Sequence, residues 1–445
     1  MQFPHWSQFR HFIILFFPLL FTQVAQIGTN VFSSIFSGQA GTVDLAGVAV
    51  AVNIWVPVFA GICGLFFGVS PIISQLRGAR KTDKIPMYII QSLYIAVFFT
   101  VIIIAIGALV LPPFLDFMNL EPPVRHIAGE YLFALALGIL PTFLMATMRY
   151  VIDAHGMTHI SMAIIVFHMV LTVILFRLLI FGGLGIEPMG GVGTGYALTI
   201  ASWIAFFLFA AIFQWKEPFR SYRIWTKLRP LSWPHCYHQL QLGIPIFIAV
   251  FCETSLFSIV GLLMAEFGTL YLAANQAAIS YATLTYTIPW SISLTATIVI
   301  GYEVGAKNFS GARQYALLCQ MTAFAAAALT VTTTYLCLDS ISHLFTNDAS
   351  TFAAIRMFLI YAMAFVFLDA AGTPVQGILR GYKDVRIITY IAFITYWLIS
   401  IPLGYACAHL TSYGPYGYWL CFIISLAINA SALNYRLWRH TAFQK

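Results

Sequence analysis

Apolar residues run along this chain in twelve long blocks that are separated by short polar stretches. Each block is about 20 residues or longer, which is the length that an α-helix needs to cross a bilayer. Barrel strands would instead alternate apolar and polar residues over roughly ten positions. The pattern therefore predicts an all-α, multi-pass membrane protein. Its predicted spans are residues 12–37, 45–75, 86–113, 127–149, 160–181, 191–214, 239–264, 270–303, 314–338, 352–379, 386–409 and 416–435.

The composition agrees with this class and narrows it. Hydrophobic residues make up 60% of the chain and charged residues 8%, whereas a soluble domain has roughly 25% charged residues. The first apolar block, from about Phe12, is too long for a signal peptide, so it is expected to be a spanning helix. The seven cysteines show no CxxC spacing, so neither disulfides nor a structural metal site is expected. The sequence also has no phosphate-binding glycine loop, which argues against an ATP motor in this chain.

Basic residues set the predicted orientation. Lys and Arg cluster in both tails and in every second loop, with Arg125, Arg177 and Arg356 as the exceptions. Since loops rich in Lys and Arg stay in the cytoplasm, both termini are expected to be cytoplasmic. The net charge of +7 comes from these loops. It therefore indicates contact with anionic lipid headgroups, and no nucleic acid partner is expected.

The two halves of the chain resemble each other. At an offset of 227 residues Pro18 matches Pro245, and at an offset of 231 Arg149 matches Arg380. Each half holds an even number of predicted spans, so both halves enter the membrane from the same side. We therefore expect two six-helix lobes related by a pseudo-twofold axis along the membrane normal, the parallel-repeat arrangement of some transporters.

A basic stretch at 216–238 separates the halves and is predicted to be a cytoplasmic linker. The predicted lobes are residues 1–215 and 239–445. Under the offset of 227, Gln26 in the first lobe takes the place of Glu253 in the second. The carboxyl group is therefore expected in the C-terminal lobe alone.

Two predicted spans carry an acid near their middle, Glu253 in the seventh and Asp369 in the tenth. An ionised carboxylate at bilayer depth costs about 2.5–3.5 kcal/mol even on insertion-derived scales, so such a residue is functional by default. Counted at 1.5 Å per residue, Glu253 lies about 22 Å and Asp369 about 16 Å above the cytoplasmic surface. The two acids can share a pocket if their helices are neighbours.

Two carboxylates in one apolar pocket cannot both stay ionised cheaply, so one takes a proton or a cation lies between them. Pro374 frees the carbonyl of Ala370 beside Asp369. Together with hydroxyls of Thr254, Ser258 or Thr373, this gives the hard-oxygen set that suits Na⁺. The same acids suit a proton relay equally well. A plainer alternative is that a neighbouring hydroxyl or amide simply satisfies each acid.

Aromatic residues make up 16% of the chain, and most of them are expected to face lipid or form interfacial belts. A few lie near the acids and are candidates for the wall of a cavity. Acidic groups with aromatic walls suit lipophilic cations through charge attraction and cation–π contacts. These candidates are Phe257, Tyr281, Tyr286, Trp290 and Phe365.

Four segments resemble a known family: VDLAGVAVAVNIWVP (43–57), SQLRGAR (74–80), FCETSLFSIVGLLMAEFG (251–268) and LDAAGTPVQGILRGYKD (368–384). They are similar to the multidrug and toxic compound extrusion (MATE) transporters, and to the NorM-like bacterial branch in particular. The resemblance implies two six-helix lobes around a V-shaped cavity in a bacterial inner membrane. It implies efflux of organic cations in exchange for Na⁺ or H⁺, with the cation site on Glu253 and Asp369.

The sequence departs from the family at one position. Much of the family has an aspartate in the first span, where this chain has Ser33. Asp44 comes later, at the expected outer start of the second span, and does not replace it. The loss favours a cation site in the C-terminal lobe, and it favours Na⁺ over a proton relay through the N-terminal lobe. Gln26 and Ser33 remain candidates for the drug cavity of that lobe.

The resulting hypothesis is a multidrug antiporter that acts as a monomer and is not an enzyme. Its expected partners are small-molecule drugs or toxins and membrane lipid, and Na⁺ or H⁺ as coupling ion is the only cofactor. A lipid-linked oligosaccharide flippase of the same superfamily is the alternative, although it would need basic residues inside the cavity. An integral membrane enzyme would need clustered His, Asp or Glu near one interface. A receptor or channel is a third alternative, but a twofold repeat with acids in one lobe only fits an exchange transporter better.

Overall fold

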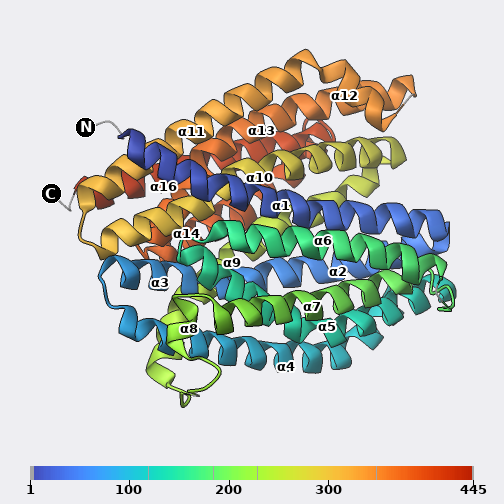
Figure 1. The fold of residues 1–445 in the computed structure, drawn as a ribbon. Helices are drawn as coiled ribbons and strands as arrows, with labels where there is room; N and C mark the ends of the chain where they lie inside the picture. Colours follow the sequence, from blue (N-terminus) through green and yellow to red (C-terminus); the bar gives the residue numbers. More distant parts are fainter. Residues whose placement is uncertain (1–4, 119, 184, 228, 347, 443–445) are drawn as a thin grey trace. The chain divides into compact units, whose positions relative to one another are not determined.

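The structure is a computed structural model that describes residues 5–118, 120–183, 185–227, 229–346 and 348–442. These residues form helices and no strand (Figure 1), apart from one isolated bridge between Gly183 and Ile186. The predicted all-α class is therefore confirmed.

The first half of the chain forms eight α-helices and a short 3-10 helix, and the second half forms the remaining helices. The first are α1 (Trp6–Ala40), α2 (Thr42–Phe67), α3 (Val69–Gly78), η1 (Thr82–Lys84), α4 (Ile85–Phe117), α5 (Pro122–Ala154), α6 (Thr158–Phe181), α7 (Val192–Trp215) and α8 (Phe219–Tyr222). The others are α9 (Trp233–Leu263), η2 (Met264–Phe267), α10 (Thr269–Gly305), α11 (Phe309–Leu336), α12 (Leu338–Phe345), α13 (Ala349–Gly381), α14 (Val385–Ala392), η3 (Phe393–Ser400), α15 (Ile401–Leu410) and α16 (Tyr416–Ala442).

Twelve stretches of the described chain are long and apolar enough to cross a membrane. Some join consecutive elements, as α14, η3 and α15 do over Val385–Leu410. The twelve predicted spans are confirmed, and the chain is a multi-pass membrane protein.

The helices extend beyond the predicted apolar blocks. Helix α9 begins at Trp233, six residues before the predicted start of its span at 239. Asp153 and Arg380, which the sequence placed at or beyond the cytoplasmic ends of spans, lie inside α5 and α13 and are buried. Hydropathy marks where lipid-facing residues end, whereas a backbone helix continues through polar residues that other helices cover.

The chain divides into two compact units. We call Met1–Leu20, Arg77–Ala79 and Ile244–Lys445 the C-terminal unit, and Phe21–Leu76 and Arg80–Gly243 the N-terminal unit. Helices α1 and α9 each contribute residues to both units. The predicted lobe limits at the linker stay a prediction.

Helix α10 is the central element of the C-terminal unit and packs along α13. It is the most buried of the twelve spans. A Cβ added at Gly377 of α13 would lie 2.1 Å from the carbonyl oxygen of Ser293 on α10, so only glycine permits this approach. The Thr297 hydroxyl donates a hydrogen bond of 3.0 Å to the Gly377 carbonyl, which joins the two backbones.

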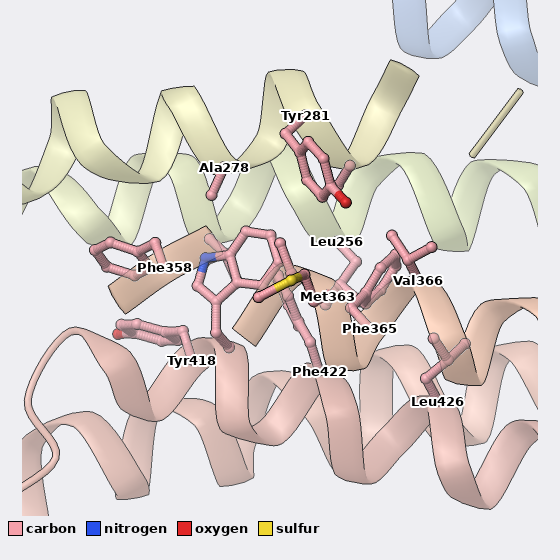
Figure 2. Packing of buried hydrophobic residues seen from close by; sticks show 14 of the residues in the cluster. Leu256, Ala278, Tyr281, Phe358, Met363, Phe365, Val366, Tyr418, Phe422 and Leu426 are labelled. Atoms are coloured by element: carbon pink, nitrogen blue, oxygen red, sulfur yellow. The ribbon is translucent and has the colours of Figure 1, made fainter. Parts of the chain in front are cut away.

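Aromatic rings fill the space between α13 and α16 (Figure 2). Trp419 is fully buried, and its indole nitrogen donates a 2.9 Å hydrogen bond to the side-chain oxygen of Asn275 on α10. Phe358, Phe365 and Phe422 surround it, with ring centroids 5.7 to 6.3 Å from the Trp419 ring. Aromatic contacts of this kind fix α10, α13 and α16 relative to one another.

We expect the Gly377→Ala variant to be destabilised, because its methyl group would overlap the backbone of Ser293. Forcing extra atoms into a packed interior costs about 1–3 kcal/mol, so the melting temperature of the purified protein in detergent should fall. Gly261→Ala is the matched control, since no atom lies within 4 Å of the added Cβ. Equal melting temperatures for the two variants would contradict the close packing of α10 against α13.

Candidate functional site

A contact between two phenylalanines brings the acid-bearing helices together. The rings of Phe257 on α9 and Phe365 on α13 have centroids 5.6 Å apart, and Phe257 also lies 5.3 Å from Phe422 on α16. Glu253 precedes Phe257 by one helical turn, and Asp369 follows Phe365 by one turn. Because two spans lie between α9 and α13 along the chain, these two helices cross the membrane in opposite directions. Both acids therefore lie on the same side of the Phe257–Phe365 contact.

The two carboxyl groups lie within electrostatic range of each other. Asp369 is 2% exposed, whereas Glu253 is half-buried. The Thr373 hydroxyl, one turn after Asp369, donates a 2.5 Å hydrogen bond to Asp369 Oδ1. The structure thus places Glu253, Asp369 and Thr373, three of the residues singled out in the sequence, at one site in the C-terminal unit.

Two tyrosines complete the polar surroundings of the acids. Tyr286 on α10 lies within hydrogen-bonding reach of the Glu253 carboxyl and within electrostatic range of Asp369. Tyr396 on η3 is buried and lies within electrostatic range of both acids. Tyr286 is among the residues that the sequence indicates, whereas Tyr396 is not, since hydropathy alone does not distinguish the inward face of a span.

Arg380 is a further residue of this site, and the hydropathy pattern does not indicate it. The pattern predicts a cytoplasmic loop at this position, but Arg380 lies in the last turn of α13 and is 1% exposed. Its guanidinium donates a 3.0 Å hydrogen bond to Gln376 and lies 5.0 Å from the centroid of the Trp290 ring. It is also within electrostatic range of Glu253. Its match with Arg149, which is buried too, was the available signal that it is not an ordinary loop residue.

The Ala370 carbonyl freed by Pro374 has a donor nearby, Gln320, and the next carbonyl, that of Ala371, has two. Gln320 on α11 directs its amide nitrogen at the carbonyl oxygens of Ala370 and Ala371, at 3.5 and 3.1 Å. Asn434 on α16 donates a 2.8 Å hydrogen bond to Ala371 as well. Of these two amides, that of Gln320 stands in for the backbone donor that proline lacks at Ala370, through a long contact of 3.5 Å.

The hydroxyls of Thr254 and Ser258, the other candidates for cation ligands, bond within α9. Thr254 donates to the carbonyl of Val250 at 2.9 Å, and Ser258 donates to that of Thr254 at 3.4 Å. Ser258 is exposed. Their oxygens keep lone pairs, but neither hydroxyl bonds to Glu253 or Asp369 in the described contacts.

The candidate aromatic residues divide into two groups. Phe257, Tyr286 and Trp290 are half-exposed, and the rings of Tyr286 and Trp290 stack with centroids 5.8 Å apart. Tyr281 and Phe365 are buried in the core (Figure 2). The Tyr281 hydroxyl pairs with Thr334 at 2.7 Å, so this side chain serves packing.

Gln26 and Ser33 belong to the N-terminal unit. Ser33 is 5% exposed, and its hydroxyl has no hydrogen-bond partner among the described residues. Gln26 is half-buried. The structure does not assign either residue to the site of Glu253 and Asp369.

The charges at this site do not cancel. Two carboxylates against the Arg380 guanidinium leave one negative charge in excess when all three are ionised. Such a surplus in a low-dielectric interior is removed by a proton or by one bound monovalent cation. The half-exposed rings beside Glu253 could contact the apolar part of a larger cation. The arrangement therefore suits reversible binding of a small cation, an organic cation or a proton.

Comparison with known proteins gives a family match. The MatE family model matches the chain twice, over residues 18–179 and 245–406. Both bounds of the second match lie 227 residues after those of the first. The repeat predicted at this offset is therefore confirmed.

Similar proteins match over almost the whole chain. A protein of Halalkalibacterium halodurans named "Probable multidrug resistance protein NorM" is 41% identical over 426 residues, which are 96% of this chain and 93% of its own length. A Bacillus cereus protein of the same name is 40% identical over 433 residues, 97% of this chain and 96% of its own length.

One solved structure is described as the outward-facing conformation of a multidrug resistance MATE family transporter of the MOP superfamily. It matches with a TM-score of 0.89 and 18% sequence identity, over 98% of this chain and 96% of that chain. This match confirms the fold that the resemblance implied.

We expect Arg380→Lys to destabilise the protein although it keeps the charge. A lysine ammonium is a compact charge without the planar fork of a guanidinium, so it cannot contact Trp290 and donate to Gln376 in the same geometry. A desolvated cation–π contact alone contributes up to about 2 kcal/mol. The melting temperature of the purified variant should fall. Arg386→Lys, at an exposed position of α14, should melt as the unmodified protein does. A stable Arg380→Lys variant would argue against the buried position of this side chain.

Proposed function

The chain belongs to the MatE family, and we propose that it is a secondary active multidrug efflux antiporter. It exports organic compounds, mostly cationic and amphiphilic, in exchange for Na⁺ or H⁺. The names of its relatives, which designate multidrug resistance proteins, support the drug-export part of the proposal. The site in the C-terminal unit supports the exchange part.

The observation that carries the proposal is the pair of neighbouring acids Glu253 and Asp369 inside two membrane-spanning helices. Two carboxyls this close in an apolar interior repel each other when both are ionised. Binding a cation relieves the repulsion, so the site favours one occupant of matching charge. Because the positive charge of Arg380 already offsets one carboxylate, a single bound cation neutralises the one negative charge that remains.

Exchange follows from competition for this charge. A coupling ion that enters down its gradient neutralises the acids and displaces a bound organic cation. When the coupling ion leaves, the restored negative charge attracts the next organic cation. Two helix arrangements are needed, one for each side of the membrane, and the occupant shifts their populations by the difference in its affinity for the two.

The half-exposed rings of Phe257 and Tyr286 provide the apolar part of the drug-binding surface, and the Trp290 ring stacks beside Tyr286. Aromatic faces attract the cationic centre of a ligand while their area buries its lipophilic part. Arg380 lies over the Trp290 ring, so Tyr286 and Phe257 are the rings that remain to contact an organic cation.

The proposal includes the setting of the protein. It resides in the bacterial inner membrane with both termini in the cytoplasm, functions as a monomer and carries out no covalent chemistry. Drugs or toxins and membrane lipid are its partners, and the coupling ion is its only cofactor. A flippase for lipid-linked oligosaccharides would need uncompensated cations to bind a pyrophosphate group. Arg380 instead lies within electrostatic range of Glu253.

Replacing either acid by its neutral amide should abolish coupled transport. We expect Glu253→Gln and Asp369→Asn each to reduce cation-dependent dye efflux at least about tenfold, because the remaining charge no longer binds the competing cations. The measurement is efflux of a fluorescent organic cation from vesicles that contain the purified variant, with protein content checked in the same vesicles.

Glu266→Gln is the control for this pair. Glu266 is an exposed acid of η2 in the same unit and pairs with His409 at 3.5 Å. Its variant should transport as the unmodified protein does. Full coupled efflux by both Glu253→Gln and Asp369→Asn would refute the proposed role of the acids.

The coupling ion can be identified in the same vesicles. Sodium jumps at constant pH and pH jumps at constant sodium are imposed side by side, with a fluorescent cation as substrate. We expect an inward gradient of the coupling ion to drive efflux and dissipation of that gradient by an ionophore to stop it. Efflux that ignores both gradients would contradict secondary antiport.

A further inference from the structure

The eleventh span contains a π-helical segment, η3, over Phe393–Ser400. Its three buried residues are Thr395, Tyr396 and Ser400, the residues of the segment that carry hydroxyls. The large apolar residues Phe393 and Leu398 are exposed. In a membrane span, burying hydroxyl residues among other helices is less costly than exposing them to lipid. π-Helical turns also occur frequently at functional sites. The segment thus directs a row of hydroxyls into the C-terminal unit.

The amide of Asn429 on α16 has its orientation fixed by this segment. Thr395 donates its hydroxyl hydrogen to the Ile391 carbonyl at 2.7 Å. Its oxygen can then only accept, and it does so from Asn429 Nδ2 at 3.0 Å. Hence the nitrogen of the Asn429 amide faces η3, and its oxygen faces away from η3.

The Asn429 side-chain oxygen has no hydrogen-bond partner among the described residues, although the residue is only 1% exposed. The hydroxyls of Ser425, one turn earlier on α16, and of Ser400 are also buried without a partner in the described chain. Buried acceptors are paired in the great majority of native proteins. This group of oxygens therefore indicates a ligand that supplies positive charge or a donor.

The unpaired oxygen faces the part of α13 that carries Asp369. A Cβ added at Gly372 would lie 3.8 Å from Asn429 Oδ1. Gly372 lies three positions after Asp369 and next to Thr373, so these residues share one face of the helix. Thr373 donates to Asp369 Oδ1, which leaves the other carboxyl oxygen available.

We propose that Asn429 supplies a neutral oxygen ligand to a sodium ion held at Asp369, with Ser425 and Ser400 lining the same position. The inference deepens the proposed antiport function and rests on it, because it assigns Na⁺ as the coupling ion. A proton needs a single carboxyl oxygen, whereas a hard metal cation needs several oxygen ligands at once. A carboxylate and an amide oxygen repel each other at close range, and a cation between them turns this repulsion into coordination.

The test is binding of radioactive Na⁺ to the purified full-length protein in detergent, at constant pH and ionic strength. Asn429→Leu keeps approximately the side-chain volume and removes the oxygen. Asn429→Asp keeps an oxygen at the same place. We expect the leucine variant to bind Na⁺ at least about tenfold more weakly, and the aspartate variant to bind as tightly as the unmodified protein or more tightly.

Gly372→Ala is a second variant that leaves every oxygen in place. The added methyl lies 3.4 Å from the Ala430 Cβ, which is an ordinary packing distance, so the variant should fold. It nevertheless narrows the space beside Asn429 Oδ1 and should weaken Na⁺ binding too. If Asn429→Leu proves unstable, the Na⁺ affinity of Gly372→Ala tests the proposed site instead.

Asn275→Leu is the matched control. Asn275 is a buried amide in the same unit, but its unpaired atom is the nitrogen donor. It lies eleven residues before Tyr286, about 16 Å along α10. Its variant should keep the Na⁺ affinity even if its melting temperature falls.

The outcomes separate this inference from the proposed function. Unchanged Na⁺ affinity in folded Asn429→Leu or Gly372→Ala overturns the inference. So does an unmodified protein that binds no Na⁺ and couples efflux to H⁺, although antiport at Glu253 and Asp369 then stands. Full coupled efflux by both Glu253→Gln and Asp369→Asn would overturn the proposed function itself. Weakened Na⁺ binding in Asn429→Leu and Gly372→Ala, with the control unaffected, supports the ligand role of Asn429.

Discussion

The structure of the C-terminal unit depends on holding two like-charged groups close together in a low-dielectric interior. Glu253 and Asp369 come from helices that are far apart in the sequence, and their repulsion opposes the packing that unites them. The edge-to-face contacts of Phe257 with Phe365 and Phe422 supply that packing. Each acid lies one turn from its phenylalanine, so the aromatic contact determines how close the carboxyls come.

The remaining features of the unit reduce the cost of this arrangement. Arg380 places a positive charge within range of Glu253, and Tyr286 provides a hydroxyl for the same carboxyl. Thr373 donates to Asp369. The close approach of α13 to α10 at Gly377 fixes the backbone between Asp369 and Arg380. The acids are therefore tolerated in this interior, but one negative charge remains for a ligand to neutralise.

The two halves of the chain are related in sequence and differ in chemistry. The family model matches both halves at a constant offset, which indicates two copies of one helical arrangement. Buried arginines occur at matched positions, Arg149 and Arg380, and so are common to both copies. At the position of Glu253 the first half has Gln26, and an acid is also absent at Ser33. The repeated scaffold thus carries an embedded acid pair in its second copy.

The sequence by itself determined the class, the number of spans and the identity of the two acids, because the cost of placing a polar group in lipid depends on composition and position along a helix. The tertiary structure decided which groups surround the acids. Arg380 and Tyr396 reach the region of Glu253 and Asp369 through helix packing and a π-helical segment. Helix packing also places Asn429 beside Gly372 of α13. Gln320 directs its amide at the Ala370 carbonyl, which the sequence had indicated as a cation ligand. Hydropathy could not predict these roles, because it averages over the circumference of each helix, and packing alone selects the face that turns inward.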